Sequence, residues 1–135
     1  MLTYSLPDVV PFVCEMVEAP LPDPQLSSVV GWTRDGEVVA GVVYEHFTGA
    51  SITATIAVAP GAVMVKEFIK EMFNFPFLTL GANIIIAFIS ESNWKSRNLV
   101  EKLGFTKETE VAGAYPDGAM LIYTITPAKC RWLEN

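Results

Sequence analysis

The fold of this chain is decided by one block of thirteen residues, Asn93-Trp94-Lys95-Ser96-Arg97-Asn98-Leu99-Val100-Glu101-Lys102-Leu103-Gly104-Phe105. Ser92 or Asn93 can cap a helix at its start, because a short polar side chain accepts a hydrogen bond from a free backbone amide. Leu99, Val100 and Leu103 form the inward face of that helix, and Gly104 is of the type preferred just past a helix end. The block therefore predicts an amphipathic helix over residues 94–103.

Immediately before this block lies a continuous apolar run, Ile84-Ile85-Ile86-Ala87-Phe88-Ile89, within residues 83–90. A run of this length without polar alternation indicates a strand buried on both faces, as in a parallel pairing. Residues 62–75 precede it and carry an apolar helical stripe, and residues 51–59 alternate like a strand before Pro60-Gly61. Strand, helix and strand form a βαβ unit, whose crossover is expected to be right-handed.

Before and after this unit, the sequence predicts two antiparallel hairpins. Residues 29–33 and 38–47 flank Asp35-Gly36, a strong hairpin signal, and residues 105–111 and 119–126 flank a turn over 114–118. A first helix is expected from Ser5 or Asp8 to about Glu18, before a proline-rich connector over 19–24. These elements predict one domain over residues 1–135, of the α+β class.

The composition excludes several classes of function. Of 135 residues, 51% are hydrophobic, which is enough for one globular core, and the net charge of -6 argues against the basic surface that nucleic-acid binding requires. Two cysteines, Cys14 and Cys130, and one histidine, His46, cannot build a four-ligand zinc site, so we expect no metal. Because the N-terminus lacks a basic segment and the apolar runs are far shorter than about 20 residues, we expect a cytoplasmic protein without a membrane partner.

The charge is unevenly distributed along the chain. Residues 1–60 carry seven acids and Arg34 alone, whereas residues 61–135 carry eight acids and eight bases. Electrostatics therefore favour a cationic ligand on the first half and an anionic ligand on the second.

The block from Asn93 to Phe105 and the order of elements resemble the GNAT family of N-acetyltransferases. Members of that family show Asn, then Ser or Ala three residues on, then a helix ending in Lys-Leu-Gly-Phe after a buried strand. The resemblance implies three layers, with flanking helices on a mixed, mostly antiparallel sheet built around a central βαβ unit. It also implies that the two central parallel strands part to admit the arm of acetyl-CoA.

The same resemblance implies where acetyl-CoA, as co-substrate, binds. Its pyrophosphate is expected at backbone amides that begin the helix after the central strand, because unpaired amides and the helix dipole attract an anion. The chain keeps Gly61 and Ala62 there, but has three larger residues where the family has small ones. The implied cofactor-binding residues are Val58, Gly61, Ala62, Val63, Met64, Val65, Lys66, Asn93, Ser96 and Arg97.

Transfer of an acyl group to an amine needs a base for the amine and benefits from an acid for the departing thiolate. Glu45 and His46 are adjacent on a predicted strand and should project to opposite faces, so that only one of them faces a cleft. We prefer Glu45, because a carboxylate also attracts a cationic amine. The family's acid position holds Val100, which cannot protonate sulfur, so Tyr115, Tyr123 or solvent is expected to take that role.

We therefore expect an acyl-CoA-dependent N-acetyltransferase that transfers acetyl from acetyl-CoA to a small-molecule or peptide amine by direct attack in a ternary complex. A catalytically inactive GNAT-like structural or binding protein, of the kind that phages encode, stays open because of Val100 and the altered loop. An enzyme of another acyl-CoA chemistry also stays open, as does a homodimer.

Overall fold

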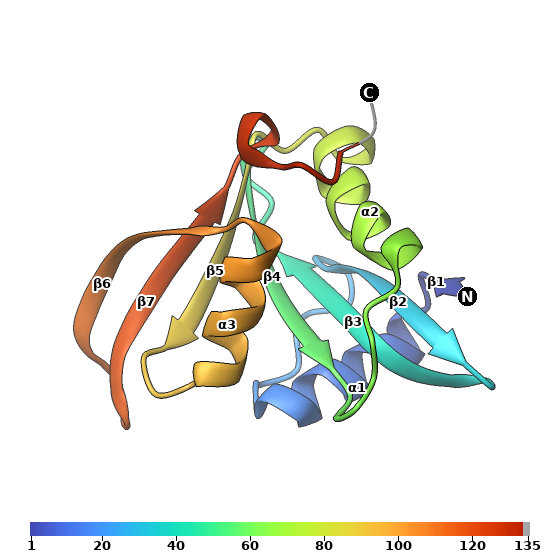
Figure 1. Ribbon diagram of the computed structural model, residues 1–135, viewed down its shortest axis with the longest axis horizontal. Helices are drawn as coiled ribbons and strands as arrows, with labels where there is room; N and C mark the ends of the chain where they lie inside the picture. The colour runs from blue at the N-terminus through green and yellow to red at the C-terminus, as the bar shows by residue number, and fades with distance from the viewer. Residues whose placement is uncertain (134–135) are drawn as a thin grey trace.

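Figure 1 shows the computed structural model, which describes residues 1–133. These residues build a seven-stranded sheet in the order β1-β2-β3-β4-β5-β7-β6. Every neighbouring pair is antiparallel except β4 with β5, as a mixed, mostly antiparallel sheet requires. The strands are β1 (Leu2–Thr3), β2 (Ser28–Arg34), β3 (Glu37–Glu45), β4 (Ser51–Val58), β5 (Ile84–Ser90), β6 (Thr106–Tyr115) and β7 (Gly118–Ile125).

The parallel pair β4 and β5 stays together over only three residue pairs, from Ser51 opposite Ile84 to Thr53 opposite Ile86. Beyond this point β4 continues to pair with β3 as far as Val58, and β5 with β7 as far as Ser90. The two strands therefore diverge while each keeps its outer partner, and the sheet opens into a fork, visible in Figure 1.

Helices cover the two faces of this sheet unequally. Helices α2 (Lys66–Asn74) and α3 (Trp94–Leu103) lie on one face, and α1 (Leu6–Val17) lies on the other (Figure 1). The larger core joins Phe68, Phe73, Val100 and Leu103 of α2 and α3 to the sheet, and a smaller core lies beneath α1. No helix within residues 1–133 combines the length and apolar character needed to cross a membrane.

The first helix sits very close to the sheet because two glycines face each other beneath it. Gly31 of β2 and Gly41 of β3 are cross-strand partners. A Cβ atom at Gly41 would lie 2.8 Å from Val9 Cγ1, and one at Gly31 would lie 2.6 Å from Val9 Cγ2. The absence of both side chains lets the apolar face of α1 approach the strand backbones.

The start of α2 differs from the prediction. The helix begins at Lys66 rather than at residue 62, and it is followed by a short π-helix, η1 (Phe75–Thr79). Before α2, the Ala62 amide donates to the Ala59 carbonyl, and Gly61 has a φ of +77°, so a turn and an extended segment replace the predicted first helical turn. The apolar stripe alone did not reveal this, because Val65 precedes the helix and still packs on the core.

The sheet differs from the prediction in two further ways. The prediction that residues 84–89 are buried on both faces is wrong, since Phe88 is 44% exposed while Ile85 and Ala87 are buried. Helix α1 packs on β2, β3 and β4. On the side of the sheet where α1 lies, β5 is therefore less covered. The short strand β1, which pairs with β2, has no counterpart among the predicted elements.

Candidate active site

The fork between β4 and β5 opens into a cavity of about 830 Å³, which we call the fork cavity. It is lined from the α3 face of the sheet by Asn93, Ser96 and Val100, and from the other face by the end of α1 and the end of β3. The tip of the β6–β7 hairpin closes one side with Tyr115 and Asp117. A molecule bound here could therefore be reached from both faces of the sheet.

A second cavity of about 430 Å³ lies between α3 and the loop that follows β4, and we call it the loop cavity. The two cavities adjoin, because Val17, Ile56, Asn93, Ser96 and Leu99 line both of them. Together they form a continuous path from the loop after β4 through the fork.

The loop cavity contains six of the ten predicted cofactor-binding residues. These are Val58, Gly61, Ala62, Met64, Asn93 and Ser96. Within residues 1–133, the backbone amides of Val63, Met64 and Val65 make no hydrogen bond. Because α2 begins only at Lys66, those amides belong to an extended segment before the helix rather than to its first turn.

Four predicted cofactor residues lie outside both cavities. Val63 is 70% exposed and lines neither cavity, and Val65 packs against the core. Lys66 is exposed at the first position of α2 and lines neither cavity. In the prediction, Val63, Val65 and Lys66 belonged to the first turns of a helix that starts at residue 62. Because α2 starts only at Lys66, the residues before it are not helical and take other positions.

Arg97, the fourth of these residues, does not have the position expected of a cofactor-binding residue. Its Nη1 donates a hydrogen bond of 2.8 Å to the Glu91 carbonyl, and its guanidinium carbon lies 4.0 Å from the centroid of the Trp94 ring. The arginine therefore joins the first turn of α3 to the loop after β5 and lines neither cavity.

Asn93 caps α3 as predicted, since its Oδ1 accepts a hydrogen bond of 3.2 Å from the Ser96 amide. Gly104 ends the helix with a φ of +109°, which also agrees with the prediction. The cap holds Asn93 and Ser96 at the place where the two cavities adjoin.

The charges of the two cavities are opposite. Glu18, Glu45 and Asp117 line the fork cavity with His46, and no lysine or arginine among the described residues does so. Lys95 and Lys102 line the loop cavity, where no described aspartate or glutamate is found. The path through the molecule therefore runs from a cavity lined by basic side chains to one lined by acidic side chains.

The expectation that only one of Glu45 and His46 faces the cleft is wrong. Both line the fork cavity. Strand β3 ends at Glu45, and His46 has a left-handed backbone with a φ of +57°, so the alternation of side chains along a strand no longer applies to it. His46 Nδ1 lies 3.1 Å from Thr53 Oγ1, on the neighbouring strand.

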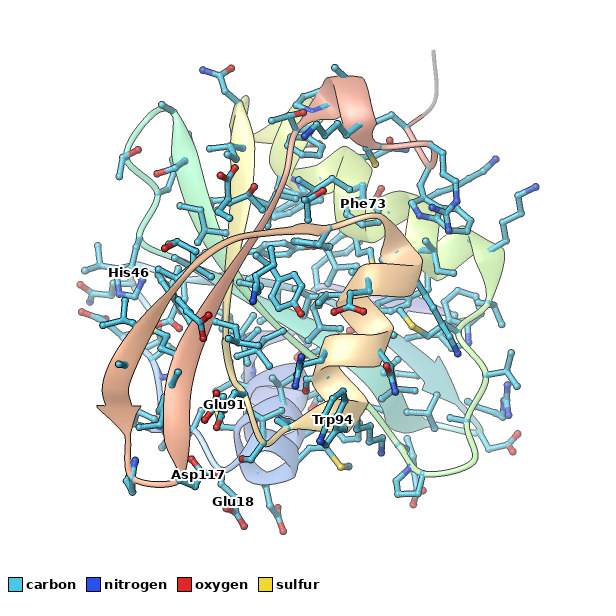
Figure 2. The ribbon with its side chains drawn as sticks, turned by 60° about the vertical axis from the view of Figure 1, so that its left-hand side comes forward. Glu18, His46, Phe73, Glu91, Trp94 and Asp117 are labelled. Atoms are coloured by element: carbon cyan, nitrogen blue, oxygen red, sulfur yellow. The ribbon has the colours of Figure 1, made fainter. Side chains whose placement is uncertain are left out.

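Asp117 is fixed at the tip of the β6–β7 hairpin by two serines. The Ser90 hydroxyl donates to its carboxylate at 3.0 Å, and the Ser92 hydroxyl donates to its other oxygen. These hydrogen bonds lower the pKa of the Asp117 carboxyl and keep it ionised, and the bond from Ser92 has the larger effect. Figure 2 shows Glu18, Glu91 and Asp117 at the same end of the molecule, where α1, the loop after β5 and this hairpin meet.

The two predicted tyrosine acids differ in position. Tyr115 lines the fork cavity, and burial, followed by the nearby Asp117 charge, raises the pKa of its hydroxyl. Tyr123 lines neither cavity, because its side chain is buried in the larger core and its hydroxyl donates to Glu101 at 2.5 Å. Tyr123 is therefore no longer a candidate acid, while Val100 does face the fork cavity as an apolar residue.

Several residues of this site were not singled out from the sequence. Glu18 ends α1 in a left-handed conformation with a φ of +56°, a position more typical of glycine. Thr53 was assigned only to a strand, and Asp117 only to a turn. Pro116-Asp117-Gly118 signals a turn in the sequence, but no local pattern indicates which distant hydroxyls the aspartate will bind.

A mixed sheet that forks between two parallel strands is the architecture of the N-acetyltransferase fold, and comparison with solved structures confirms this fold. A variant of the spermidine N-acetyltransferase from Vibrio cholerae is similar over 96% of this chain and 96% of its own, with a TM-score of 0.76 and 15% identity. A Vibrio cholerae spermidine N-acetyltransferase in complex with CoA and spermine is similar over 77% and 68%, with a TM-score of 0.65 and 17% identity.

The N-acetyltransferase PseH of Campylobacter jejuni, in complex with acetyl coenzyme A, is similar over 78% of this chain and 70% of its own. Its TM-score is 0.60 and its identity 18%. The sequence itself matches no protein-family model and no curated protein. At these identities the likeness establishes the fold, and the chemistry must be argued from the site.

Proposed function

We propose that this chain is an acetyl-CoA-dependent N-acetyltransferase whose acceptor is a small cationic amine. The observation that carries the proposal is the pair of adjoining cavities with opposite charge, which meet at the fork. A transferase needs its two substrates to meet end to end, and here an anionic and a cationic substrate would each be attracted to its own side.

The residues of the loop cavity fit the anionic part of acetyl-CoA. The unpaired amide of Met64 can donate to a phosphate oxygen, and Lys95 and Lys102 supply positive charge. Acetyl-CoA supplies the activated acetyl group as a thioester. Asn93 and Ser96 would contact the pantetheine arm where the cavities adjoin, and the arm would then pass toward Val100 in the fork.

The residues of the fork cavity fit the acceptor. Glu18, Glu45 and Asp117 attract an ammonium group, and Glu45 would serve as its anchor or as the base. The deprotonated nitrogen forms a bond to the acetyl carbon as the carbon–sulfur bond breaks. Tyr115, which its raised pKa keeps protonated, would donate a proton to the thiolate and recover one from the new amide nitrogen.

Calorimetric titration tests the cofactor half of this proposal. We expect acetyl-CoA to bind with a dissociation constant on the order of micromolar. The double variant Lys95→Gln, Lys102→Gln should weaken that binding by about tenfold, because two charges near the phosphates are removed. Lys107→Gln on β6, which pairs with Glu110 away from both cavities, is the matched control and should bind normally. No heat at millimolar acetyl-CoA would overturn the proposal.

Release of free CoA thiol tests the acceptor half. A panel of a triamine, a diamine, a monoamine and an amino acid should show kcat/KM decreasing in that order, since each step removes a positive charge or adds a negative one. The differences should shrink as salt screens the carboxylates. Binding of acetyl-CoA without thiol release for any amine would favour the alternative of a catalytically inactive binding protein, for which Val100 in the fork cavity is the specific support.

A further inference from the structure

The single histidine of the chain, His46, shares a hydrogen bond with Thr53. Thr53 Oγ1 lies 3.1 Å from the Glu45 carbonyl oxygen and 3.1 Å from His46 Nδ1. A carbonyl oxygen can only accept, and a threonine hydroxyl has one proton to donate. We assign that proton to the Glu45 carbonyl, and the hydroxyl oxygen then accepts from the imidazole. With this assignment, neutral His46 carries its proton on Nδ1 and has a lone pair on Nε2.

This Nε2 lone pair is available to a ligand. Within residues 1–133, Nε2 makes no hydrogen bond, and His46 lines the fork cavity beside Glu45. The turn that follows is held in place by Thr48, whose Oγ1 accepts from the amides of Ala50 and Ser51 at 3.2 and 2.9 Å. The backbone on both sides of His46 is thus fixed by strand pairing and by this turn.

We propose that His46 Nε2 is the general base that removes a proton from the ammonium group of the acceptor, and that Thr53 is the positioning residue that holds the required tautomer. The inference rests on the proposed function and deepens it. One ammonium proton passes to Nε2 and is later released to solvent. The free amine then forms the nitrogen–carbon bond, the carbon–sulfur bond breaks, and a second proton from that nitrogen ends on the thiolate as CoA thiol.

The imidazole is better suited to this step than the carboxylates around it. An imidazole changes charge between about pH 5 and 8, so it can accept a proton and release it again near neutral pH, whereas an ionised carboxylate is a weak base there. Among residues 1–133, the other titratable groups that line the cavity with His46 are Glu18, Glu45, Tyr115 and Asp117. Glu45, the neighbour of His46 in the chain, would hold the cation while the histidine takes the proton.

A nuclear magnetic resonance measurement tests the tautomer without any need for activity. Because His46 is the only histidine, its ring nitrogens give the only imidazole signals of a chain labelled with nitrogen-15. At a pH where the ring is neutral, we expect a protonated Nδ1 and an unprotonated Nε2. Thr53→Val should produce a mixture of tautomers, while Thr53→Ser, which keeps the hydroxyl, should not. A wild-type ring protonated on Nε2 would overturn the inference.

The pH dependence of kcat/KM tests the catalytic role. We expect His46→Gln to lower kcat by about 100-fold with little change in KM and to lose the acid limb of the profile. Thr53→Val should lower kcat without raising KM, and Thr109→Val on the exposed strand β6 should leave both unchanged. Glu45→Gln should mainly raise KM. His46 is exposed, so its variant should keep the wild-type melting temperature.

The outcomes separate this inference from the function on which it rests. A wild-type chain that binds no acetyl-CoA and releases no thiol with any amine overturns the proposed function, and the catalytic role of His46 with it. A wild-type chain that is active, together with a His46→Gln variant of equal rate and unchanged pH profile, overturns the His46 role alone.

Discussion

Asp117 illustrates how one side chain joins separate elements at the mouth of the fork cavity. Its carboxylate accepts hydrogen bonds from Ser90 at the end of β5 and from Ser92 before α3, although it stands in the β6–β7 turn. The sequence predicts the turn and the helix cap but not this contact, because the residues are separated by 25 and 27 positions. Contacts over such separations depend on how the elements pack rather than on local patterns.

The lowered pKa of Asp117 predicts a pH-dependent contribution to stability. Its ionised form is favoured in the folded chain, so this contribution is present above the ordinary carboxyl pKa of about 3.9 and is lost as the pH falls through the lower folded value. We expect Asp117→Asn to melt below wild type at pH 7 and to converge with it at the acid end of a melting series.

Asp35→Asn is the control for this series. Asp35 stands in the turn between β2 and β3 with a φ of +53°, a conformation that asparagine also tolerates. Its melting difference from wild type should stay small and should not vary across the same pH range. A constant deficit of the Asp117 variant at every pH would contradict the proposed charge effect.

Tyr115 is the remaining candidate acid, and its removal gives a second prediction at this scale. Tyr115→Phe keeps the ring but deletes the proton donor, so kcat should fall by about 100-fold if thiolate protonation limits the rate. Tyr123→Phe, in the core and away from both cavities, should leave kcat near the wild-type value. Equal loss in the two variants would argue against a role for Tyr115 in proton transfer.

At the scale of elements, the position of α1 depends on the two glycines beneath it. The sequence predicts this helix and the β2–β3 hairpin correctly in outline, from the prolines, the Asp-Gly turn and the β-branched residues. It does not indicate that Gly31 and Gly41 become cross-strand partners under Val9. Because the end of α1 supplies Glu18 and Val17 to the cavities, this close approach also positions part of the site.

Gly41→Ala should therefore destabilise the chain by about 1–3 kcal/mol, as overpacking of a well-filled core does. The added Cβ would lie 2.8 Å from Val9 Cγ1 and 3.0 Å from Val13 Cγ2. Chemical denaturation measures the change. The double variant with Val9→Ala removes part of the clash, so its loss should be smaller than the sum of the two single losses. Simple additivity would show that the clash is not the cause.

At the scale of the whole molecule, the C-terminal segment returns to the end of α3. Trp132 Nε1 donates to the Leu103 carbonyl at 2.9 Å, and the Arg131 guanidinium donates to the Lys102 carbonyl at 2.5 Å. These carbonyls belong to the last turn of a helix, where they lack helical partners. Residues 29 positions apart thus fix the helix that lines both cavities.

Trp132→Phe should lower the free energy of unfolding by about 1 kcal/mol, because it deletes one hydrogen bond and leaves the Leu103 carbonyl without that partner. Trp94→Phe is the matched control. Trp94 is 63% exposed, and its indole donates no hydrogen bond among residues 1–133, so the same substitution should change stability little. Equal losses in the two variants would show that the ring size, and not the hydrogen bond, is responsible.

Apart from β1 and η1, the sequence by itself determined the order of the main elements, the capped helix over residues 94–103 and the parallel pair that frames the fork. These features rest on side-chain periodicity, caps and turn residues, which act within a few positions of the chain. Only the tertiary structure decided that α2 starts at Lys66, that Glu45 and His46 share one cavity, and that Arg97 leaves the site for Glu91 and Trp94. Those outcomes depend on packing and on hydrogen bonds between distant residues, whose partners no local pattern of residues specifies.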